Sequence, residues 1–434
     1  MPTQCHLVGV AGSGMSALAQ LLLAEGVQVS GSDRFSDRGE DLEVITKLRA
    51  AGLVLFPQDG SGVPPSGNCT VIASSAVEAT NPDIAAARNS GAEVVGRAEM
   101  LARLATGREC IAVAGTSGKS TVTGMVGCLL EGVGADPTVV DGGAVVNWVS
   151  DTAVGNVRVG RTGPWVIETD ESDKSLLKFS PTWAIITNIG VDHFDLAESE
   201  ALFKAFAARV RNPVVGPDCI GAGVRILGES FSGTLFSWHE VDFKVPVPGR
   251  HNVSNAVQAL TLCERLGYAA RSLVEPLAGF RGIERRLQVA GMLNGAVIID
   301  DFGHNPAKIR ASWETVAPHF RRIIAVWRPH GFRPLEFMQE ELVATIADVC
   351  RGGDEFGVVP VFYAGGTVTR RVTSETFVER LKAAGVAAVF HPDLRTCEEH
   401  LAGHAGPGDA VLIMGARDPE LPRLARALAA RQGR

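Results

Sequence analysis

Val113-Ala114-Gly115-Thr116-Ser117-Gly118-Lys119-Ser120-Thr121 is the stretch of this chain from which its fold follows. The apolar run 109–114 predicts a strand that leads into it, and 120–131 predicts a helix that leaves it. A glycine turn between a strand and a helix points backbone N–H groups and the helix dipole at an anion. Lys119 adds a positive charge, and the Ser120 hydroxyl can reach a magnesium ion. We therefore predict a phosphate loop. The alternative is a glycine-rich turn with a solvated lysine.

One position of this loop departs from the usual pattern. A glycine normally stands five residues before Gly118, and here Val113 occupies that place. The strand before it and the helix after it are nevertheless as a phosphate loop requires. We predict a shortened variant of the loop.

Length and composition indicate an ordinary globular protein. The chain has 434 residues, 46% of them hydrophobic and 21% charged, which corresponds to about three domains of typical size. Its net charge of −7 comes without long runs of one sign, so nucleic acid is not expected as a partner. None of the eight cysteines forms a CxxC pair, which disfavours metal clusters and fits a reducing compartment.

The termini and apolar segments predict a cytoplasmic protein. The N-terminus lacks a basic region followed by an apolar stretch and a cleavage site. No segment offers the roughly 18 uninterrupted apolar residues that a membrane span needs. We expect no membrane partner, and a monomer or a homodimer.

Short β-branched runs alternate with longer amphipathic ones along the whole chain, which predicts an α/β protein with largely parallel sheets. We expect three α/β domains. They are a Rossmann-like N-terminal domain at 1–106, a central P-loop ATPase domain at 107–291 and a Rossmann-like C-terminal domain at 292–434. Residues 212–250 are predicted to form a hairpin-rich insert.

The first domain carries a second glycine turn, Gly9-Val10-Ala11-Gly12-Ser13-Gly14, between a predicted strand and a predicted helix. Such a turn lets a diphosphate approach the helix N-terminus. Asp33, at the end of the next strand, can accept hydrogen bonds from a nucleotide. A tight βα turn without a ligand is the alternative.

Polar residues follow two predicted strands of the central domain. Glu168 begins an acidic cluster that extends to Asp173, and His193 ends the segment that starts at Asn188. Ligands bind at the carboxyl ends of the strands in open α/β sheets. A carboxylate there would complete a magnesium site begun by Ser120. The alternative for each acid is a solvated loop charge.

The third domain is predicted from strand-like runs at 296–300, 322–327, 358–364, 386–390 and 410–414, which alternate with helical segments. Polar residues again follow the strands. They include His304 and Asn305 after the first strand, and His330 and Arg333 after the second.

These motifs together resemble those of the Mur ligase family, ATP-dependent amide ligases that build the peptide of peptidoglycan. The resemblance covers all three domains in family order. It rests on Ala114–Ser120, Thr187–His193, His251–Ala256, Gly282–Leu287 and Asp300–Pro306. Ser74, Ser75, Met15 and the Arg97–Leu101 segment are most similar to the branch of the family that joins L-alanine to the carboxylate of UDP-N-acetylmuramate.

The resemblance implies a role for each matched residue. It implies ATP and Mg²⁺ as cofactors, with UDP-N-acetylmuramate or a similar sugar nucleotide and an amino acid as substrates. The catalytic residues would be Lys119, Glu168, His193, His304 and His330. The metal ligands would be Ser120, Glu168 and His193. ATP would contact Gly115, Thr116, Ser117, Gly118, Lys119, Ser120, Thr121, Asn252, Asn255, Arg286 and Asp301. The UDP-sugar would contact Gly12, Ser13, Gly14, Met15, Ser32, Asp33, Ser74 and Ser75, and the amino acid His304, Asn305, His330 and Arg333.

Three positions depart from the alanine-adding branch. That branch has histidine at the positions of Ser117 and Asn305, and arginine at the position of Gly331, two residues before Arg333. The loss of a guanidinium removes a bidentate clamp for a carboxylate. The identity of the amine therefore stays open, and glycine, serine or a peptide are alternatives to alanine.

The sequence leaves three alternatives to an alanine-adding ligase. A related ligase could attach a recycled peptide or another amine, or use another carboxylic acid. A non-catalytic nucleotide sensor is disfavoured by the Lys119-Ser120 pair and by Glu168 and His193. A nicotinamide enzyme would explain the Gly9–Gly14 turn but would leave the phosphate loop and the third domain unexplained.

Overall fold

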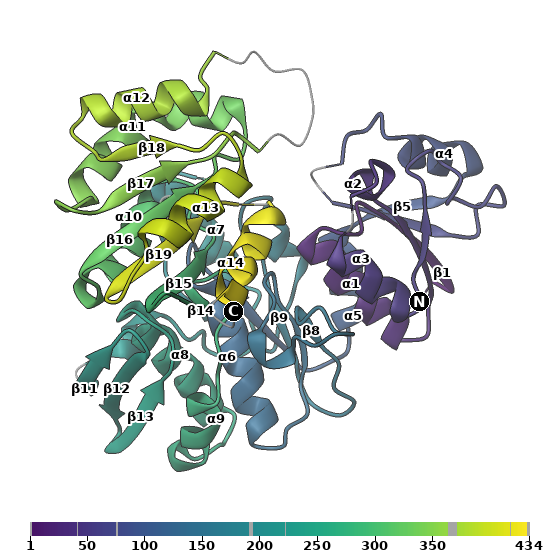
Figure 1. Ribbon diagram of the computed structural model, residues 1–434. Coiled ribbons are helices and arrows are strands. Elements are labelled where there is room, and N and C mark those ends of the chain that lie inside the picture. Colours follow the sequence, from purple (N-terminus) through teal and green to yellow (C-terminus); the bar gives the residue numbers. More distant parts are fainter. Residues whose placement is uncertain are drawn as a thin grey trace. The chain divides into compact units, whose positions relative to one another are not determined.

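The computed structural model of the chain describes residues 2–40, 42–74, 77–190, 194–221, 223–362, 371–416 and 418–431 (Figure 1). The chain divides into two compact units. Unit 1 comprises Met1–Glu229, Gly233–Pro246 and Arg250–Ile283, and unit 2 comprises Ser230–Ser232, Val247–Gly249 and Glu284–Arg434. The mixed α/β architecture confirms the predicted fold class. The predicted domain boundaries at 106 and 291 stay predictions.

The N-terminal part of unit 1 is a five-stranded parallel sheet in the order β3-β2-β1-β4-β5. Its strands are β1 (Gln4–Val8), β2 (Gln28–Ser32), β3 (Val54–Phe56), β4 (Thr70–Ala73) and β5 (Glu93–Gly96). Its helices are α1 (Ser13–Ala24), α2 (Arg34–Asp37), α3 (Glu43–Ala50), α4 (Pro82–Ser90) and α5 (Arg97–Ala105).

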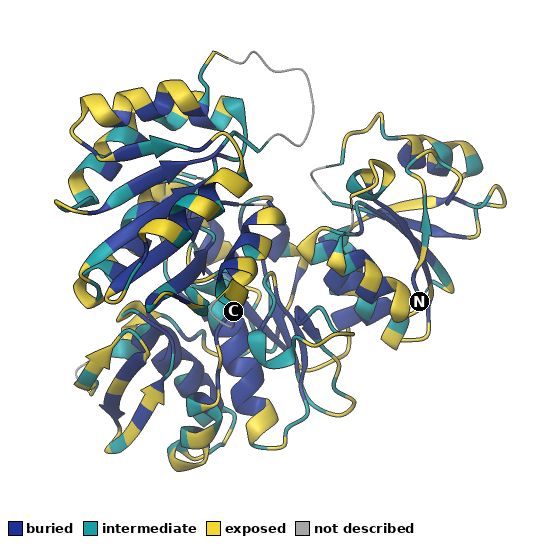
Figure 2. Ribbon diagram, in the orientation of Figure 1, coloured by how far each residue is buried: buried dark blue, intermediate teal, exposed yellow. Residues whose placement is uncertain are grey.

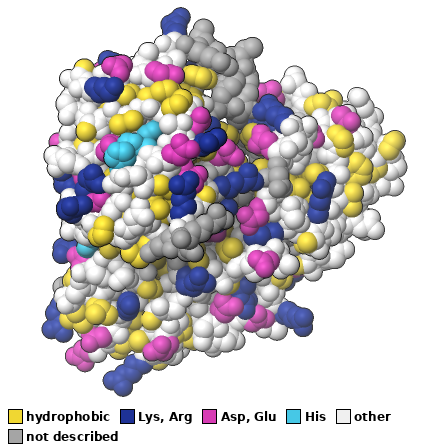
Figure 3. Space-filling model, in the orientation of Figure 1, with side chains coloured by type: hydrophobic (Ala, Val, Ile, Leu, Met, Phe, Trp, Pro, Cys, Tyr) yellow, Lys and Arg dark blue, Asp and Glu magenta, His cyan; other side chains and the backbone are white. Residues whose placement is uncertain are grey.

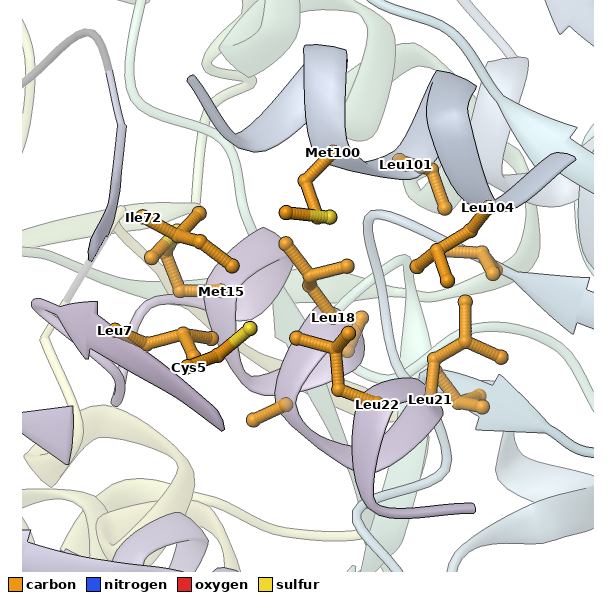
Figure 4. Close-up of a cluster of buried hydrophobic side chains, with 14 of the residues drawn as sticks. Cys5, Leu7, Met15, Leu18, Leu21, Leu22, Ile72, Met100, Leu101 and Leu104 are labelled. Atoms are coloured by element: carbon orange, nitrogen blue, oxygen red, sulfur yellow. The ribbon is translucent and has the colours of Figure 1, made fainter. Parts of the chain in front are cut away.

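Helix α1 forms because its apolar residues recur at helical spacing and bury one face. Its buried side chains include Leu18 and Leu22, which lie between strand β1 and helix α5 (Figure 4). From α5, Met100 and Leu104 complete the same cluster. Each large apolar side chain buried in this way contributes roughly 1.5–3 kcal/mol relative to an exposed one. The packing fixes the position of the Gly9–Gly14 turn that precedes α1.

The central part of unit 1 holds the phosphate loop. Its sheet has the order β10-β6-β9-β7-β8, and all pairs are parallel except β7 with β8. The strands are β6 (Cys110–Ala114), β7 (Thr138–Val140), β8 (Val157–Arg158), β9 (Trp165–Glu168) and β10 (Trp183–Ile186). The α-helices are α6 (Lys119–Gly132), α7 (Leu196–Ala207), α8 (His251–Arg265) and α9 (Val274–Ala278), with short 3-10 turns η1 (Val146–Trp148), η2 (Ser175–Lys178), η3 (Pro217–Ile220) and η4 (Ala270–Leu273).

The insert predicted at 212–250 contains a three-stranded sheet in the order β11-β12-β13. Its strands are β11 (Arg225–Ser230), β12 (Gly233–Trp238) and β13 (Val241–Val245). Strands β12 and β13 form an antiparallel pair, which confirms a hairpin.

Unit 2 contains a six-stranded sheet in the order β14-β15-β19-β16-β17-β18, in which only β14 runs antiparallel to its neighbour. Its strands are β14 (Gln288–Leu293), β15 (Ala296–Asp301), β16 (Arg322–Trp327), β17 (Glu355–Val358), β18 (Ala388–Phe390) and β19 (Asp409–Met414). Its helices are α10 (Pro306–Val316), α11 (Phe332–Val349), α12 (Ser374–Ala383), α13 (Leu394–His404) and α14 (Glu420–Ala430), with η5 at Ala317–His319.

Apolar clusters lie on both faces of this sheet, and the strands are the most deeply buried segments of the ribbon (Figure 2). One predicted strand was misplaced. The run 358–364 was expected to be a strand, but β17 ends at Val358. Pro360 follows, and proline has no N–H to donate to a sheet ladder.

Within the described ranges, no helix is long and apolar enough to cross a membrane. On the face shown in Figure 3, basic and acidic side chains are interspersed.

Candidate active site

The phosphate loop lies between β6 and α6, as predicted. Gly115 and Gly118 adopt φ angles of 134° and 82°, which L-residues with side chains rarely adopt. A Cβ on Gly115 would collide with Thr187, and one on Gly118 would lie 2.9 Å from Oδ1 of Asn255. Both glycines are therefore required by backbone shape and by close neighbours. The backbone N–H groups of the first turn of α6 have no acceptors within the helix, which suits them to an anion.

The segment after β10 holds the phosphate loop in shape. The Asn188 side chain accepts a hydrogen bond from the Ser117 N–H at 3.0 Å and donates one to the Ser117 carbonyl at 2.9 Å. The Thr187 hydroxyl also donates to the Ser117 carbonyl at 2.6 Å, and the Gly190 N–H donates to the Thr116 hydroxyl at 2.9 Å. The Thr116 N–H also donates to the Asn188 carbonyl at 3.1 Å. These five hydrogen bonds leave the loop little freedom.

Asn252 and Asn255 lie on α8, and both are buried. The Asn255 amide donates to the Asn252 side-chain oxygen at 2.9 Å. Asn255 supports the phosphate loop behind Gly118. A direct contact of these two residues with ATP stays a prediction.

Lys119 and a carboxylate that was not among the predicted site residues form an ion pair. The Lys119 Nζ lies 2.7 Å from Oε2 of Glu171 and 2.8 Å from the Gly115 carbonyl oxygen. The Glu171 side chain is 7% exposed. Burial raises the pKa of Glu171, and Lys119 opposes that rise. Glu171 belongs to the acidic cluster seen in the sequence, but only the fold shows which acid of the cluster faces the lysine.

Glu168 and Ser120 both lie beside the glycine pair Gly142-Gly143. The Gly142 N–H donates to Oε2 of Glu168 at 2.8 Å, and a Cβ on Gly143 would lie 3.8 Å from Cβ of Ser120. Oε1 of Glu168 has no hydrogen-bond partner among the residues that the structure describes. A hydroxyl and a carboxylate oxygen are ligands that Mg²⁺ accepts. His193, the third predicted ligand, lies outside the described residues.

The N-terminal glycine turn is shaped by backbone hydrogen bonds. The Gly9 and Val10 N–H groups donate to the Ser32 carbonyl at 2.8 and 3.0 Å. The Asp33 carboxylate accepts from the Ala11 N–H at 3.1 Å and from the Phe35 N–H at 3.0 Å. Asp33 therefore fixes the turn and caps α2, and its contact with a nucleotide stays a prediction.

Two predicted UDP-sugar residues turn their side chains inward. Met15 is 3% exposed and belongs to the apolar core (Figure 4). The Ser32 hydroxyl is fully buried and donates to the Asp83 carboxylate. Their contact with a UDP-sugar stays a prediction. Ser75 lies outside the described residues, and Ser74 is partly exposed after β4.

Arg97 is a site candidate that the predictions missed. It is the first residue of α5, and a Cβ on Gly14 would lie 3.1 Å from its Nε and Cζ atoms. Its guanidinium forms no hydrogen bond or ion pair with any other described residue. A guanidinium beside the N-terminus of α1 favours an anion there. The signal was available in the sequence only as part of the Arg97–Leu101 family motif.

In unit 2, the Asp301 carboxylate accepts hydrogen bonds from three donors of the protein, and its contact with ATP stays a prediction. Its Oδ1 accepts from the Leu287 N–H at 3.0 Å, and its Oδ2 accepts from the Gly303 N–H at 2.9 Å and the Ser312 hydroxyl at 2.7 Å. The residue is 6% exposed. Asp301 thus fastens the segment before β14 to the end of β15. The Arg286 guanidinium lies 5.3 Å from the centre of the Phe302 ring.

The two predicted histidines of unit 2 are brought together. The rings of His304 and His330 are 4.9 Å apart, edge to face. The His304 Nδ1 lies 2.9 Å from the Phe302 carbonyl oxygen. Burial, with a smaller effect of Lys308, lowers the pKa of His304 to about 4, so the ring is neutral at pH 7.

The departures at Asn305 and Gly331 have structural reasons. Asn305 is the N-cap of α10, where its side chain accepts from the Lys308 N–H at 2.9 Å. Gly331 is the N-cap of α11 with φ 134°, a conformation in which an arginine would be strained. Arg333, in the first turn of α11, forms no hydrogen bond or ion pair with other residues in the described part of the chain.

Comparisons with known proteins agree on one family. The model described as "Mur ligase family, catalytic domain" matches residues 4–109, and the model described as "Mur ligase, glutamate ligase domain" matches residues 285–417. A UDP-N-acetylmuramate–L-alanine ligase of Rhizobium meliloti is 34% identical over 95% of this chain and 93% of its own length. The corresponding ligase of Mycolicibacterium smegmatis is 32% identical over 95% and 92%.

Solved structures give the same result. The crystal structure of UDP-N-acetylmuramate–alanine ligase from Thermotoga maritima matches with a TM-score of 0.81 and 26% identity, over 99% of each chain. A murein peptide ligase from Psychrobacter arcticus matches over 99% of each chain with a TM-score of 0.67 and 21% identity, which indicates a shared fold.

Proposed function

Because the chain belongs to the Mur ligase family, we propose that it joins L-alanine to UDP-N-acetylmuramate at the expense of ATP. The two substrates are those in the names of its relatives. The observation that carries the proposal is the phosphate loop with Lys119 at its end, which Thr187 and Asn188 hold in shape.

In the proposed reaction, a carboxylate oxygen of UDP-N-acetylmuramate attacks the γ-phosphorus of ATP, giving an acyl phosphate and ADP. The amine of the amino acid then attacks the acyl carbon, and inorganic phosphate leaves. Lys119 would stabilise the charge on the transferring phosphoryl group, because a fixed cation in a site with little water is worth more than one in solvent. Hydrogen bonds to Asn188 hold the loop in advance, so little reorganisation is needed when the nucleotide binds.

Ser120 and Glu168 are the residues that would hold Mg²⁺, with His193 as the third ligand implied by the family. Among the described residues, Oε1 of Glu168 has no hydrogen-bond partner, which fits this assignment. When bound, the ion would offset the negative charge of the triphosphate.

The diphosphate of the sugar nucleotide would bind at the Gly9–Gly14 turn. The first-turn N–H groups of α1 supply donors, and Arg97 supplies the charge next to Gly14. His304 would present a neutral ring to the incoming amine, because burial lowers its pKa to about 4.

Phosphate release from ATP tests this proposal. The chain should release phosphate with UDP-N-acetylmuramate and L-alanine together, and not when either is omitted. Each other amino acid should be tested in place of alanine. No turnover with alanine, but turnover with another amine, would move the proposal to that amine.

One observation favours a second candidate, a ligase for a different amine. Asn305 is used as a helix cap, and Gly331 leaves no side chain where the alanine-adding branch has a guanidinium. A recycled peptide should therefore be included among the amines. Faster turnover with the peptide than with alanine would favour the second candidate.

A further inference from the structure

Three acceptors of the protein surround the Lys119 ammonium in the part of the chain that the structure describes. Its Nζ lies 2.7 Å from Oε2 of Glu171, 2.8 Å from the Gly115 carbonyl oxygen and 3.4 Å from the Thr116 carbonyl oxygen. An ammonium has three protons to donate. A phosphate that binds in the loop must therefore compete with one of these acceptors for Lys119.

The local structure places Glu171 for this contact. The Thr169 N–H and hydroxyl both donate to the Val113 carbonyl, at 2.9 and 3.1 Å, which fastens the start of the acidic segment to β6. The Asp170 carbonyl accepts from the Leu176 N–H at 3.1 Å and the Ser175 hydroxyl at 3.2 Å, which closes the segment into a loop. Glu171 therefore sits on a backbone held at both ends.

Of the three acceptors, Glu171 is the one that a phosphate can replace. The two carbonyls belong to the same loop as Lys119, and the side chains of Thr187 and Asn188 hold the backbone of that loop. The carboxylate is the only one of the three that carries a charge, and a phosphate supplies the same charge in its place. Lys119 is 15% exposed and Glu171 is 7% exposed, so the pair is weakly screened by solvent.

We propose that Glu171 is a positioning residue that holds Lys119 in the nucleotide-free protein, and that Lys119 exchanges the Glu171 carboxylate for a nucleotide phosphate when ATP binds. This inference rests on the proposed function for its nucleotide. The exchange leaves Glu171 buried without its nearest cation, and Asp170 beside it adds to the cost. Glu171 therefore keeps the lysine in place in the empty site and lowers the affinity for ATP.

The test is the affinity of Glu171→Gln for ATP, ADP and AMP, measured by calorimetry without the acid or the amine. Glutamine has the size of glutamate but no charge, and the two carbonyls still hold Lys119. We expect ATP and ADP to bind on the order of tenfold more tightly than to the unsubstituted chain, the effect of one ordinary charge-assisted hydrogen bond. AMP should bind equally to both, because the loop lysine reaches the β- and γ-phosphates.

Asp173→Asn is the matched control. Asp173 lies in the same segment and is exposed, and its Oδ1 accepts from the Ser175 N–H, a bond that asparagine can also form. This variant should bind all three nucleotides as the unsubstituted chain does. If Glu171→Gln did not fold, Glu171→Asp would replace it. The shorter side chain lengthens the ion pair, and a smaller tightening confined to ATP and ADP is expected.

Unchanged or weaker binding of ATP to Glu171→Gln would overturn the inference. So would equal tightening of ATP and AMP, because that result would show a general change of the site. ATP binding with the expected pattern but without ligation would contradict the proposed function and support the exchange. Failure of the unsubstituted chain to bind ATP would contradict both.

Discussion

Two corners of unit 1 have the same local design, a parallel strand followed by a glycine turn and a helix. The phosphate loop carries its cation within the motif, since Lys119 begins α6. The Gly9–Gly14 turn has no basic residue of its own, and Arg97 reaches it from α5, a helix far along the chain. A motif can be recognised in a sequence when its charges are contiguous with its backbone. When the charge arrives through tertiary packing, only the fold reveals it.

The largest difference between the two turns should come from Lys119, the cation of the phosphate loop. Lys119→Ala removes the cation that would stabilise the γ-phosphoryl group, and kcat should fall on the order of a hundred- to a thousandfold. Phosphate release in the presence of both other substrates measures it. Lys244→Ala, at an exposed position of β13, is the control and should keep full activity. Retained activity of Lys119→Ala would refute the assignment of the phosphate loop.

Unit 2 also contains a strand followed by a turn and a helix. There the acid Asp301 accepts hydrogen bonds from backbone N–H groups. Asp301→Asn places an amide donor against the Gly303 N–H or the Leu287 N–H, so the free energy of unfolding should drop by about 2 kcal/mol. Urea denaturation measures the change. Ser312→Ala removes only one of the three donors and should cost less. Unchanged stability with weaker ATP binding would instead support the predicted contact of Asp301 with the nucleotide.

Arg97 sharpens the comparison between the two glycine turns. Arg97→Ala should raise the KM for UDP-N-acetylmuramate roughly tenfold with a smaller change in kcat, because a charge that contacts a remote diphosphate contributes binding in ground and transition states alike. Arg103→Ala, in the same helix but paired with Glu93 and Glu99, should leave the KM unchanged. An equal effect of both substitutions would show that the turn does not use Arg97.

The smallest expected effect is the pH dependence that His304 gives to stability. Its pKa is lowered from 6.5 to about 4 in the folded chain, so the unfolded chain binds more protons between these values. The free energy of unfolding should therefore decline as the pH falls through this window. His304→Gln should lose less stability than the unsubstituted chain over the same range. Asp300, whose pKa is raised to about 6 by burial, acts in the opposite direction but is present in both proteins. Parallel pH profiles of the two would contradict the assignment.

The sequence supported the fold class, the phosphate loop and the family, because alternating periodicity and contiguous motifs carry them. It did not reveal that Asn188 and Thr187 hold the loop, although both stand in a recognised motif. It also did not reveal that Asp301 accepts from the Leu287 and Gly303 N–H groups, since an acid at a strand end can contact a ligand or the backbone with the same sequence pattern. These contacts depend on segments that come together only in the fold.

The central claim is that the chain activates a carboxylate as an acyl phosphate. The most direct test uses UDP-N-acetylmuramate labelled with heavy oxygen in its carboxylate, together with ATP and L-alanine, and mass analysis of the phosphate released. The account predicts one labelled oxygen in each phosphate, because the carboxylate oxygen that attacks ATP leaves with the phosphoryl group. Phosphate without label, released in amounts equal to the amide formed, would contradict it.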